Sequence, residues 1–252
     1  MSFNFSPRIV TDGLVLHLDA ANIKSYPGSG INWFDLSKSS NNGVLVNNPI
    51  FNNSNFGNII FNGLDNYVDN IGNTTDYNFI FSEGTFSISF WVKRTNNNTR
   101  YVFAGNTLTN NEKGWFIVIE FGVSGFGDNC LRFHASGNAL NTKLIAGSTD
   151  DNTINTSWTH CVFTCENPDK VGKWYINGVS VNTTTRLGSG NDIQGTYYNG
   201  PSTRVINIGR SNFNTTVTPL NGNIAQFSIY KKKLSPQEVL QNYNTTKTRF
   251  GL

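Results

Sequence analysis

Short stretches in which hydrophobic and polar residues alternate recur along almost the whole chain. In "TFSISFWV", the residues Phe86, Ile88 and Phe90 fall on one face of an extended strand, opposite two serines and a tryptophan. Ten other segments have similar strand character: GLVLHLDA, NIIFNG, RYVFAGN, WFIVIEFG, CLRFHAS, KLIAGS, WTHCVFTCE, KWYINGVSV, RVINIGRS and IAQFSIYKKKL. Segments of this length and spacing predict an all-β protein.

Turn-forming residues separate these segments. Asn-Gly pairs, which tolerate the positive φ of a tight hairpin, occur at 42–43, 62–63, 177–178 and 221–222. The pair inside "KWYINGVSV" predicts a hairpin between two short apolar strands. So many short strands favour a two-sheet antiparallel β-sandwich of the jelly-roll kind, whose inner faces form the core.

One short helix is expected near the C-terminus. Ser235 is the predicted N-cap, Pro236 the first helical residue, and Glu238 the partner that completes a capping box. The predicted apolar face of this helix consists of Val239, Leu240 and Tyr243.

The chain shows no composition break and no fixed repeat, so one sandwich domain is expected over residues 11–244. Residues 1–10 are interpreted as an N-terminal arm and residues 245–252 as a C-terminal tail. We expect both ends to become ordered only against a partner, because chain termini rarely order unless something holds them.

Composition excludes several classes of protein. Of the 252 residues, 37% are hydrophobic and only 14% charged, which argues against disorder. The net charge is +3, and the one basic run, Lys231 to Lys233, is interpreted as a solvated corner. We therefore expect no nucleic-acid partner. Apolar runs are too short for a membrane span, and no signal peptide is visible.

Two local features have structural interpretations. Cys161 and Cys165 lie on the same face of a predicted strand, about 13 Å apart along it, so we expect buried thiols in a reducing cytoplasm. In "YPGSGINWFDLSKSSNNG", the glycines lead to a strand and not to a helix N-terminus, so a phosphate cradle is disfavoured. Trp33 is expected to anchor this loop, and Asp35 to cap its turn at Leu36-Ser37.

Several segments, in this order along the chain, carry a resemblance to a known family. They are GLVLHLDAANIKSYPGSGINWFDLS, IIFNGLDNYVD, TFSISFWVKR, WTHCVFTCEN with KWYINGV, and INIGRSN with LNGNIAQFSIYKKKLSPQEVLQNYN. From about Leu14 to Tyr243 the chain resembles the laminin-G-like, concanavalin A-like superfamily, in the form found in structural proteins of tailed phages. The resemblance implies a lectin-like sandwich and a place in a virion, assembled in the host cytoplasm. This fold also hosts lectins, glycosidases and adhesion modules, so it does not settle function.

Catalytic residues are not evident. A glycosidase of this fold needs two carboxylates roughly 5–10 Å apart. Glu120 in "IVIEFG" stands alone, and Glu83, Glu112 and Glu166 are expected to lie in loops. The histidines, His17, His134 and His160, lie in strand-like runs without a catalytic signature, and structural roles are expected for them. We therefore predict that the protein is not an enzyme.

Two kinds of binding site remain open. The long loop between Thr183 and Arg204 offers aromatic faces and amides suited to sugars, namely Tyr197, Tyr198, Asn191, Asp192, Gln194 and Asn199; the alternative is a flexible loop or one that packs on a neighbouring subunit. A weaker candidate is the loop from Gly105 to Trp115. Calcium is a possible cofactor, with candidate oxygen ligands in Asp65, Asp69 and Asp128.

The leading hypothesis is a non-enzymatic virion decoration or fibre protein. It would bind other virion subunits and, through its loops, polysaccharide on the host surface. A virion role also favours a homo-oligomer, although no coiled-coil heptads are present. The alternatives are a stand-alone soluble lectin, a purely architectural decoration protein and, with less support, a glycan-cleaving tail enzyme.

Overall fold

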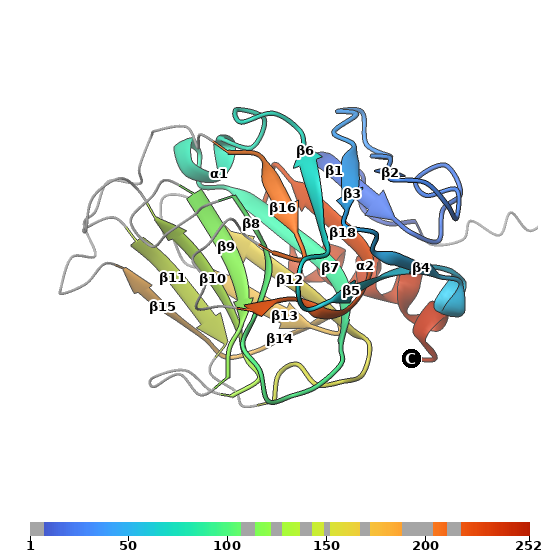
Figure 1. Cartoon of the computed structure of the whole chain (residues 1–252). Helices are drawn as coiled ribbons and strands as arrows, with labels where there is room; N and C mark the ends of the chain where they lie inside the picture. The colour runs from blue at the N-terminus through green and yellow to red at the C-terminus, as the bar shows by residue number, and fades with distance from the viewer. Residues whose placement is uncertain are drawn as a thin grey trace, which may run out of the picture.

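Two β-sheets pack face to face in the computed structural model (Figure 1). The structure describes residues 8–106, 114–121, 128–136, 143–148, 152–166, 172–187, 204–210 and 218–252. Strand pairing within the described residues is antiparallel, with the one exception of β17 (Thr218–Pro219) beside β8 (Tyr101–Gly105). The predicted two-sheet antiparallel sandwich is confirmed.

Sheet A runs in the order β14-β13-β12-β7-β18-β5-β4, with β1 paired to one part of β18. Its strands are β1 (Leu14–Asp19), β4 (Ile50–Asn52), β5 (Asn58–Asn62), β7 (Phe86–Arg94), β12 (Thr159–Cys165), β13 (Lys173–Ile176), β14 (Val179–Ser180) and β18 (Asn221–Tyr230). The long central strands β7 and β18 therefore join the two halves of the sheet.

Sheet B runs in the order β15-β11-β10-β9-β8-β16-β6-β3-β2. In addition to β8 and β17 it contains β2 (Asn32–Trp33), β3 (Gly43–Val46), β6 (Tyr67–Ile71), β9 (Gly114–Ile119), β10 (Leu131–Ser136), β11 (Lys143–Ser148), β15 (Thr183–Leu187) and β16 (Ile206–Ile208). The helical elements are η1 (Ser54–Phe56), α1 (Phe79–Ser82), α2 (Pro236–Thr246) and η2 (Lys247–Phe250). The one-turn helix α1 was not predicted.

Aromatic rings from both sheets fill the core. Phe90 of sheet A stacks on Phe103 of sheet B with ring centroids 4.0 Å apart. Phe163 of sheet A stacks on Phe133 of sheet B at 4.4 Å. The inward face of β7 predicted from its alternation is therefore the face that packs across the sandwich.

The outer face of sheet A is covered by the C-terminal end of the chain. Trp91, on the outward face of β7, is only 1% exposed. Its indole Nε1 donates to Thr246 Oγ1 at 2.8 Å, and its ring stacks on Phe250 at 4.1 Å. Because α2 and η2 bury this face, β7 is buried on both sides even though its sequence alternates.

Several local predictions are confirmed. Tyr175 pairs with Ser180 in the hairpin of β13 and β14, with Asn177 and Gly178 at positive φ. Helix α2 begins with the predicted capping box, in which the side chains of Ser235 and Glu238 each accept from the other residue's backbone N–H.

The loop that begins at Tyr26 has the expected structural role. Trp33 is fully buried in the core. Asp35 Oδ1 accepts the Ser37 N–H at 2.8 Å, as expected for a turn cap, and also the His17 N–H at 2.8 Å. The side chains of Cys161 and Cys165 are buried, and neither forms a disulfide bond with another described residue.

Three predictions need correction. Residues 245–252 do not form a separate tail, because α2 runs through Thr246 and η2 packs on sheet A. The Asn-Gly pair at 221–222 begins strand β18 and does not form a turn, since Asn221 and Gly222 pair with β5. Leu240 is 43% exposed and does not belong to the buried face of α2, whereas the predicted Val239 is fully buried, together with Asn242 and Thr246.

Candidate functional site

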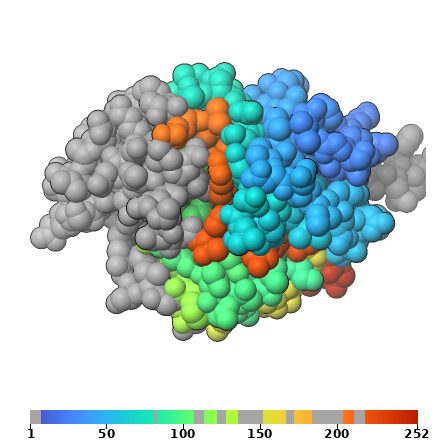
Figure 2. Space-filling view, viewed as in Figure 1, coloured from blue at the N-terminus to red at the C-terminus, as the bar shows by residue number. Residues whose placement is uncertain are grey.

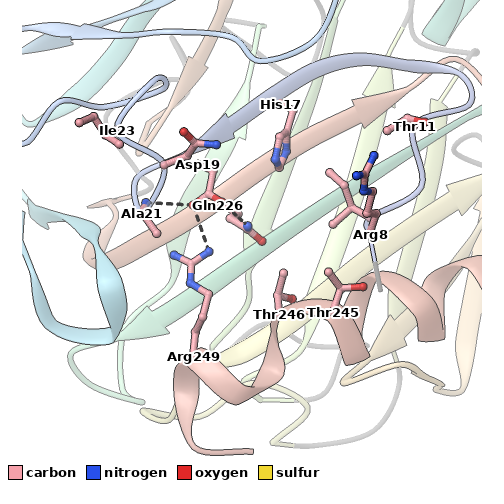
Figure 3. A pocket seen from close by; sticks show the side chains of 12 residues that line it. Arg8, Thr11, His17, Asp19, Ala21, Ile23, Gln226, Thr245, Thr246 and Arg249 are labelled. Atoms are coloured by element: carbon pink, nitrogen blue, oxygen red, sulfur yellow. Dashed lines mark hydrogen bonds and ion pairs between the residues drawn. The ribbon is translucent and has the colours of Figure 1, made fainter. Parts of the chain in front are cut away.

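A cavity of about 590 Å³ opens between the outer face of sheet A and the C-terminal end of the chain (Figure 3). It is lined by Arg8, Ile9, Thr11, His17, Asp19, Ala21, Asn22, Ile23, Gln226, Thr245, Thr246 and Arg249. These residues come from the N-terminal segment, β1, the turn that follows β1, β18, α2 and η2. The volume is in the range of small-ligand sites, roughly 300–1,000 Å³.

Alternation along β1 places polar side chains in this cavity. Leu16 and Leu18 are fully buried in the core between the sheets. The intervening His17 and the following Asp19 point to the opposite face, where α2 and η2 cover the sheet. Their cavity neighbour Gln226 comes from the paired strand β18, in register with Asp19.

Asp19 holds the centre of the cavity together. Its Oδ1 accepts the Ala21 N–H at 2.9 Å and forms an ion pair with Arg249 Nη1 at 3.0 Å. Its Oδ2 accepts from Gln226 Nε2 at 2.7 Å. The side chains of Asp19 and Arg249 are only 14% and 13% exposed, so this is a largely buried, charge-assisted network with fixed geometry.

His17 forms a neutral part of the cavity floor. Its ring is 7% exposed, and Nδ1 lies 2.8 Å from Ser228 Oγ. Burial lowers the pKa of His17, and the nearby carboxylates of Asp19 and Asp35 offset only part of that effect. The ring is therefore uncharged at neutral pH and offers hydrogen bonding without charge.

The charge balance of the cavity is slightly positive. Asp19 and Arg249 neutralise each other, and Arg8 has no ion-pair partner in the part of the chain that the structure describes. The cavity therefore suits a neutral or anionic ligand better than a cationic one.

The lining offers polar groups that can contact a ligand. Among the described residues that line the cavity, Asp19 is the one carboxylate, and both of its oxygens are engaged. Hydrolysis of a glycosidic bond uses a pair of carboxylates across the bond. The amide, guanidinium and hydroxyl groups present are the groups that bind sugar hydroxyls.

The carbohydrate residues predicted from the sequence lie outside the described residues. Tyr197, Tyr198, Asn191, Asp192, Gln194 and Asn199 all fall within 188–203, and most of the second candidate loop falls within 107–113. Their role stays a prediction.

The structure does not bring the calcium candidates together. Asp65 Oδ1 accepts from Asn62 Nδ2 in the turn between β5 and β6, whereas Asp69 Oδ1 accepts from Asn207 Nδ2 across β6 and β16. Asp128 lies in an exposed turn before β10. Within the described ranges, no three His, Cys, Asp or Glu side chains are grouped so that they could hold a metal ion.

Glu120, the isolated acidic residue of "IVIEFG", is part of a buried ion-pair cluster. The carboxylate is fully buried, with Oε2 at 2.6 Å from Arg100 Nε and Oε1 at 2.5 Å from Arg132 Nη2. Both oxygens are thus held by arginines, which supports a structural role.

The cavity was not anticipated from the sequence. The sequence predicts a structural role for His17, in agreement with its hydrogen bond to Ser228, but no sequence pattern indicates Asp19 and Arg249. They are 230 positions apart, so no local motif connects them. The available signal was the alternation of β1, which predicts that His17 and Asp19 share one face.

Comparisons with known proteins agree with this architecture. The family model described as the concanavalin A-like lectin/glucanases superfamily matches residues 61–240, more than half of the chain. No curated protein sequence matches. Among the described residues, no helix is both long and apolar enough to cross a membrane.

Solved structures share the fold at low sequence identity. Domain 4 of an extracellular arabinanase from Geobacillus stearothermophilus, in complex with arabinotriose, is 17% identical with a TM-score of 0.61, covering 94% of this chain and 100% of that domain. The botulinum neurotoxin DC binding domain, in complex with rat synaptotagmin II, is 20% identical with a TM-score of 0.63.

The binding domain of Paraclostridial Mosquitocidal Protein 1 is 20% identical with a TM-score of 0.62, over 92% of this chain. The chain spans about half the length of the neurotoxin and mosquitocidal binding domains, 52% in each case. The family match and the two-sheet sandwich agree: the chain belongs to the concanavalin A-like lectin/glucanases superfamily.

Proposed function

We propose that the protein binds carbohydrate and does not cleave it. The observation that carries the proposal is the cavity of Figure 3, a hollow of ligand size with a fixed Asp19–Gln226–Arg249 network in a lectin-like sandwich. Carboxylate, amide and guanidinium groups in fixed positions are suited to the hydroxyls of a sugar. The solved structures similar in fold include an arabinanase domain in complex with arabinotriose and a botulinum neurotoxin binding domain in complex with SialylT.

The biological setting that we propose is a virion. The order of the sequence segments from GLVLHLDA to the C-terminal helix supports it, because the chain resembles structural proteins of tailed phages in this respect. Displayed as a homo-oligomer on a capsid or tail, the protein would hold other virion subunits and host-surface polysaccharide. A stand-alone soluble lectin is the second candidate, and it needs no partner beyond the sugar.

Binding to an oligosaccharide panel tests the function. We expect the purified protein to bind at least one member in isothermal titration calorimetry, and to release no new reducing ends from it. Thr245→Trp, which fills the cavity, is expected to abolish binding there, whereas Asn244→Trp adds the same bulk at an exposed neighbouring position and serves as the control.

A double variant of the long loop and a virion assay distinguish the proposed site and setting from their alternatives. Loss of binding in Tyr197→Ala/Tyr198→Ala but not in Thr245→Trp would move the site to the long loop. Turnover of the glycan would contradict the non-enzymatic proposal. Absence of the protein from purified virions, measured by mass spectrometry, would favour the stand-alone lectin.

A further inference from the structure

The turn that contains η1 has an unusual backbone beside the cavity. Asn55 and Phe56 both adopt left-handed conformations, with φ of 56° and 64°. Asparagine tolerates this region, but a bulky residue such as phenylalanine rarely occupies it. The Phe56 side chain does not gain compensating burial, because the residue is 75% exposed.

Contacts from distant parts of the chain hold this turn in place. Asn55 Oδ1 accepts from Trp158 Nε1 at 3.0 Å, and Asn55 Nδ2 donates to the Arg249 carbonyl at 2.8 Å. The Arg249 guanidinium donates in return to the Gly57 carbonyl at 3.3 Å. Two residues that flank Phe56 are thus hydrogen-bonded to a residue that lines the cavity.

The turn also packs directly on the end of β1. A Cβ at Gly57 would lie 2.4 Å from the Ala20 carbonyl oxygen, so only glycine fits there. Ala21, which follows Ala20 in the chain, lines the cavity. The early strands in blue and the C-terminal segment in red meet at this end of the molecule (Figure 1; Figure 2).

A strained residue whose conformation is fixed by its surroundings indicates function when its side chain has no structural role. The described contacts hold the backbone of the turn and leave the Phe56 ring open to solvent. An exposed aromatic ring matches the apolar C–H face of a sugar ring, whose polar edge needs hydrogen-bonding groups. The cavity supplies polar groups, and none of its described lining residues is Phe, Tyr or Trp, so Phe56 would add the aromatic surface that these residues do not provide.

We infer that Phe56 and the cavity form one saccharide-binding site. Phe56 is the platform for a pyranose ring, and the Asp19–Gln226–Arg249 network binds hydroxyls of the same sugar or the adjoining one. Arg249 links the two parts, since it holds both the turn and Asp19. This assignment rests on the proposed carbohydrate-binding function and specifies where the sugar lies.

Three variants test the assignment. Phe56→Asn removes the ring but keeps a residue that tolerates positive φ; Phe56→Tyr keeps the ring. Leu64→Asn is the matched control, because Leu64 is 77% exposed in another surface turn. Each is titrated by calorimetry with arabinotriose, maltotriose, chitotriose and sialyllactose, and thermal unfolding is followed for each.

If the sugar stacks on Phe56, we expect Phe56→Asn to weaken saccharide binding by about tenfold or more, the size expected for loss of an aromatic stacking contact. Phe56→Tyr and Leu64→Asn should bind as the wild type does, and the unfolding temperature of Phe56→Asn should not fall. Wild-type affinity in Phe56→Asn would overturn the platform while leaving carbohydrate binding intact. Absence of wild-type binding to every saccharide would overturn the proposed function itself, and Phe56-dependent self-association without sugar binding would overturn both.

Discussion

Glu120 shows what the sequence leaves open about a single residue. In the sequence it is a lone glutamate in an apolar strand, and in the structure both of its oxygens pair with Arg100 and Arg132 in a buried cluster. Burial lowers the pKa of Arg132, and the charge of Glu120 counteracts that effect. The Glu120 carboxylate therefore offsets the positive charge of Arg100 and Arg132 in this cluster.

Replacing Glu120 tests this role. Glu120→Gln should lower the free energy of unfolding by about 3 kcal/mol, because it leaves a mostly buried arginine without its counter-charge. Sugar affinity should not change. Urea unfolding and calorimetric titration of the same samples measure both. Unchanged stability with lost affinity would place Glu120 in a binding site.

Buried histidines make the protein sensitive to acid. Burial lowers the pKa of His160 to about 3, and its Nε2 lies 3.0 Å from Ser89 Oγ on the outer face of sheet A. Because this pKa is below the unfolded value of 6.5, the full stabilisation is present above pH 6.5 and is lost as the pH falls. His17, whose pKa is also lowered, contributes in the same direction.

The effect of His160 on stability is large enough to measure. Because the unfolded state binds about one proton more than the folded state, His160 alone should lower the free energy of unfolding by about 1.4 kcal/mol as the pH falls from 7.5 to 5.5. Urea unfolding at the two pH values measures it. His160→Gln should show a smaller pH dependence than the wild type, and an equal dependence in the two proteins would contradict neutral burial of this ring.

Single elements differ in how much of them can be predicted from local sequence. The hairpin at Asn177-Gly178 and the capping box of α2 were predictable because their determinants lie within a few residues. The position of η2 was not, because it depends on a contact between Arg249 and Asp19 across most of the chain. The candidate site depends on the same long-range contact, so local sequence patterns could not predict it either.

The C-terminal segment should contribute to stability as an integral part of the domain. Phe250 stacks on Trp91 with ring centroids 4.1 Å apart and packs at a tilt against Trp158 with ring centroids 4.8 Å apart. Phe250→Ala should lower the free energy of unfolding by about 2 kcal/mol, less than for a fully buried phenylalanine because the ring is partly exposed. Chemical unfolding monitored by tryptophan fluorescence measures this loss.

A matched change at the same end of the chain serves as the control. Leu252→Ala removes an exposed side chain and should leave stability unchanged. A Phe250→Ala protein as stable as the wild type would restore the original interpretation of residues 245–252 as an arm that orders only on a partner.

At the scale of the whole molecule, the inner faces of the sheets and the outer face of sheet A have different roles. The inner faces form an aromatic core, while the outer face of sheet A is covered by α2 and η2 and hollowed where they meet β1. The composition and alternation of the strands were enough to predict the sandwich. They could not show which outer face is covered, because α2 has a short and partly polar buried face.

Calorimetric titration of the wild-type protein and Phe56→Asn with the oligosaccharide panel tests the central claim most directly. We expect the wild type to bind at least one saccharide and the variant to bind it about tenfold more weakly, with equal thermal stability of the two proteins. No binding by the wild type to any saccharide would contradict the claim that this lectin-like protein recognises carbohydrate.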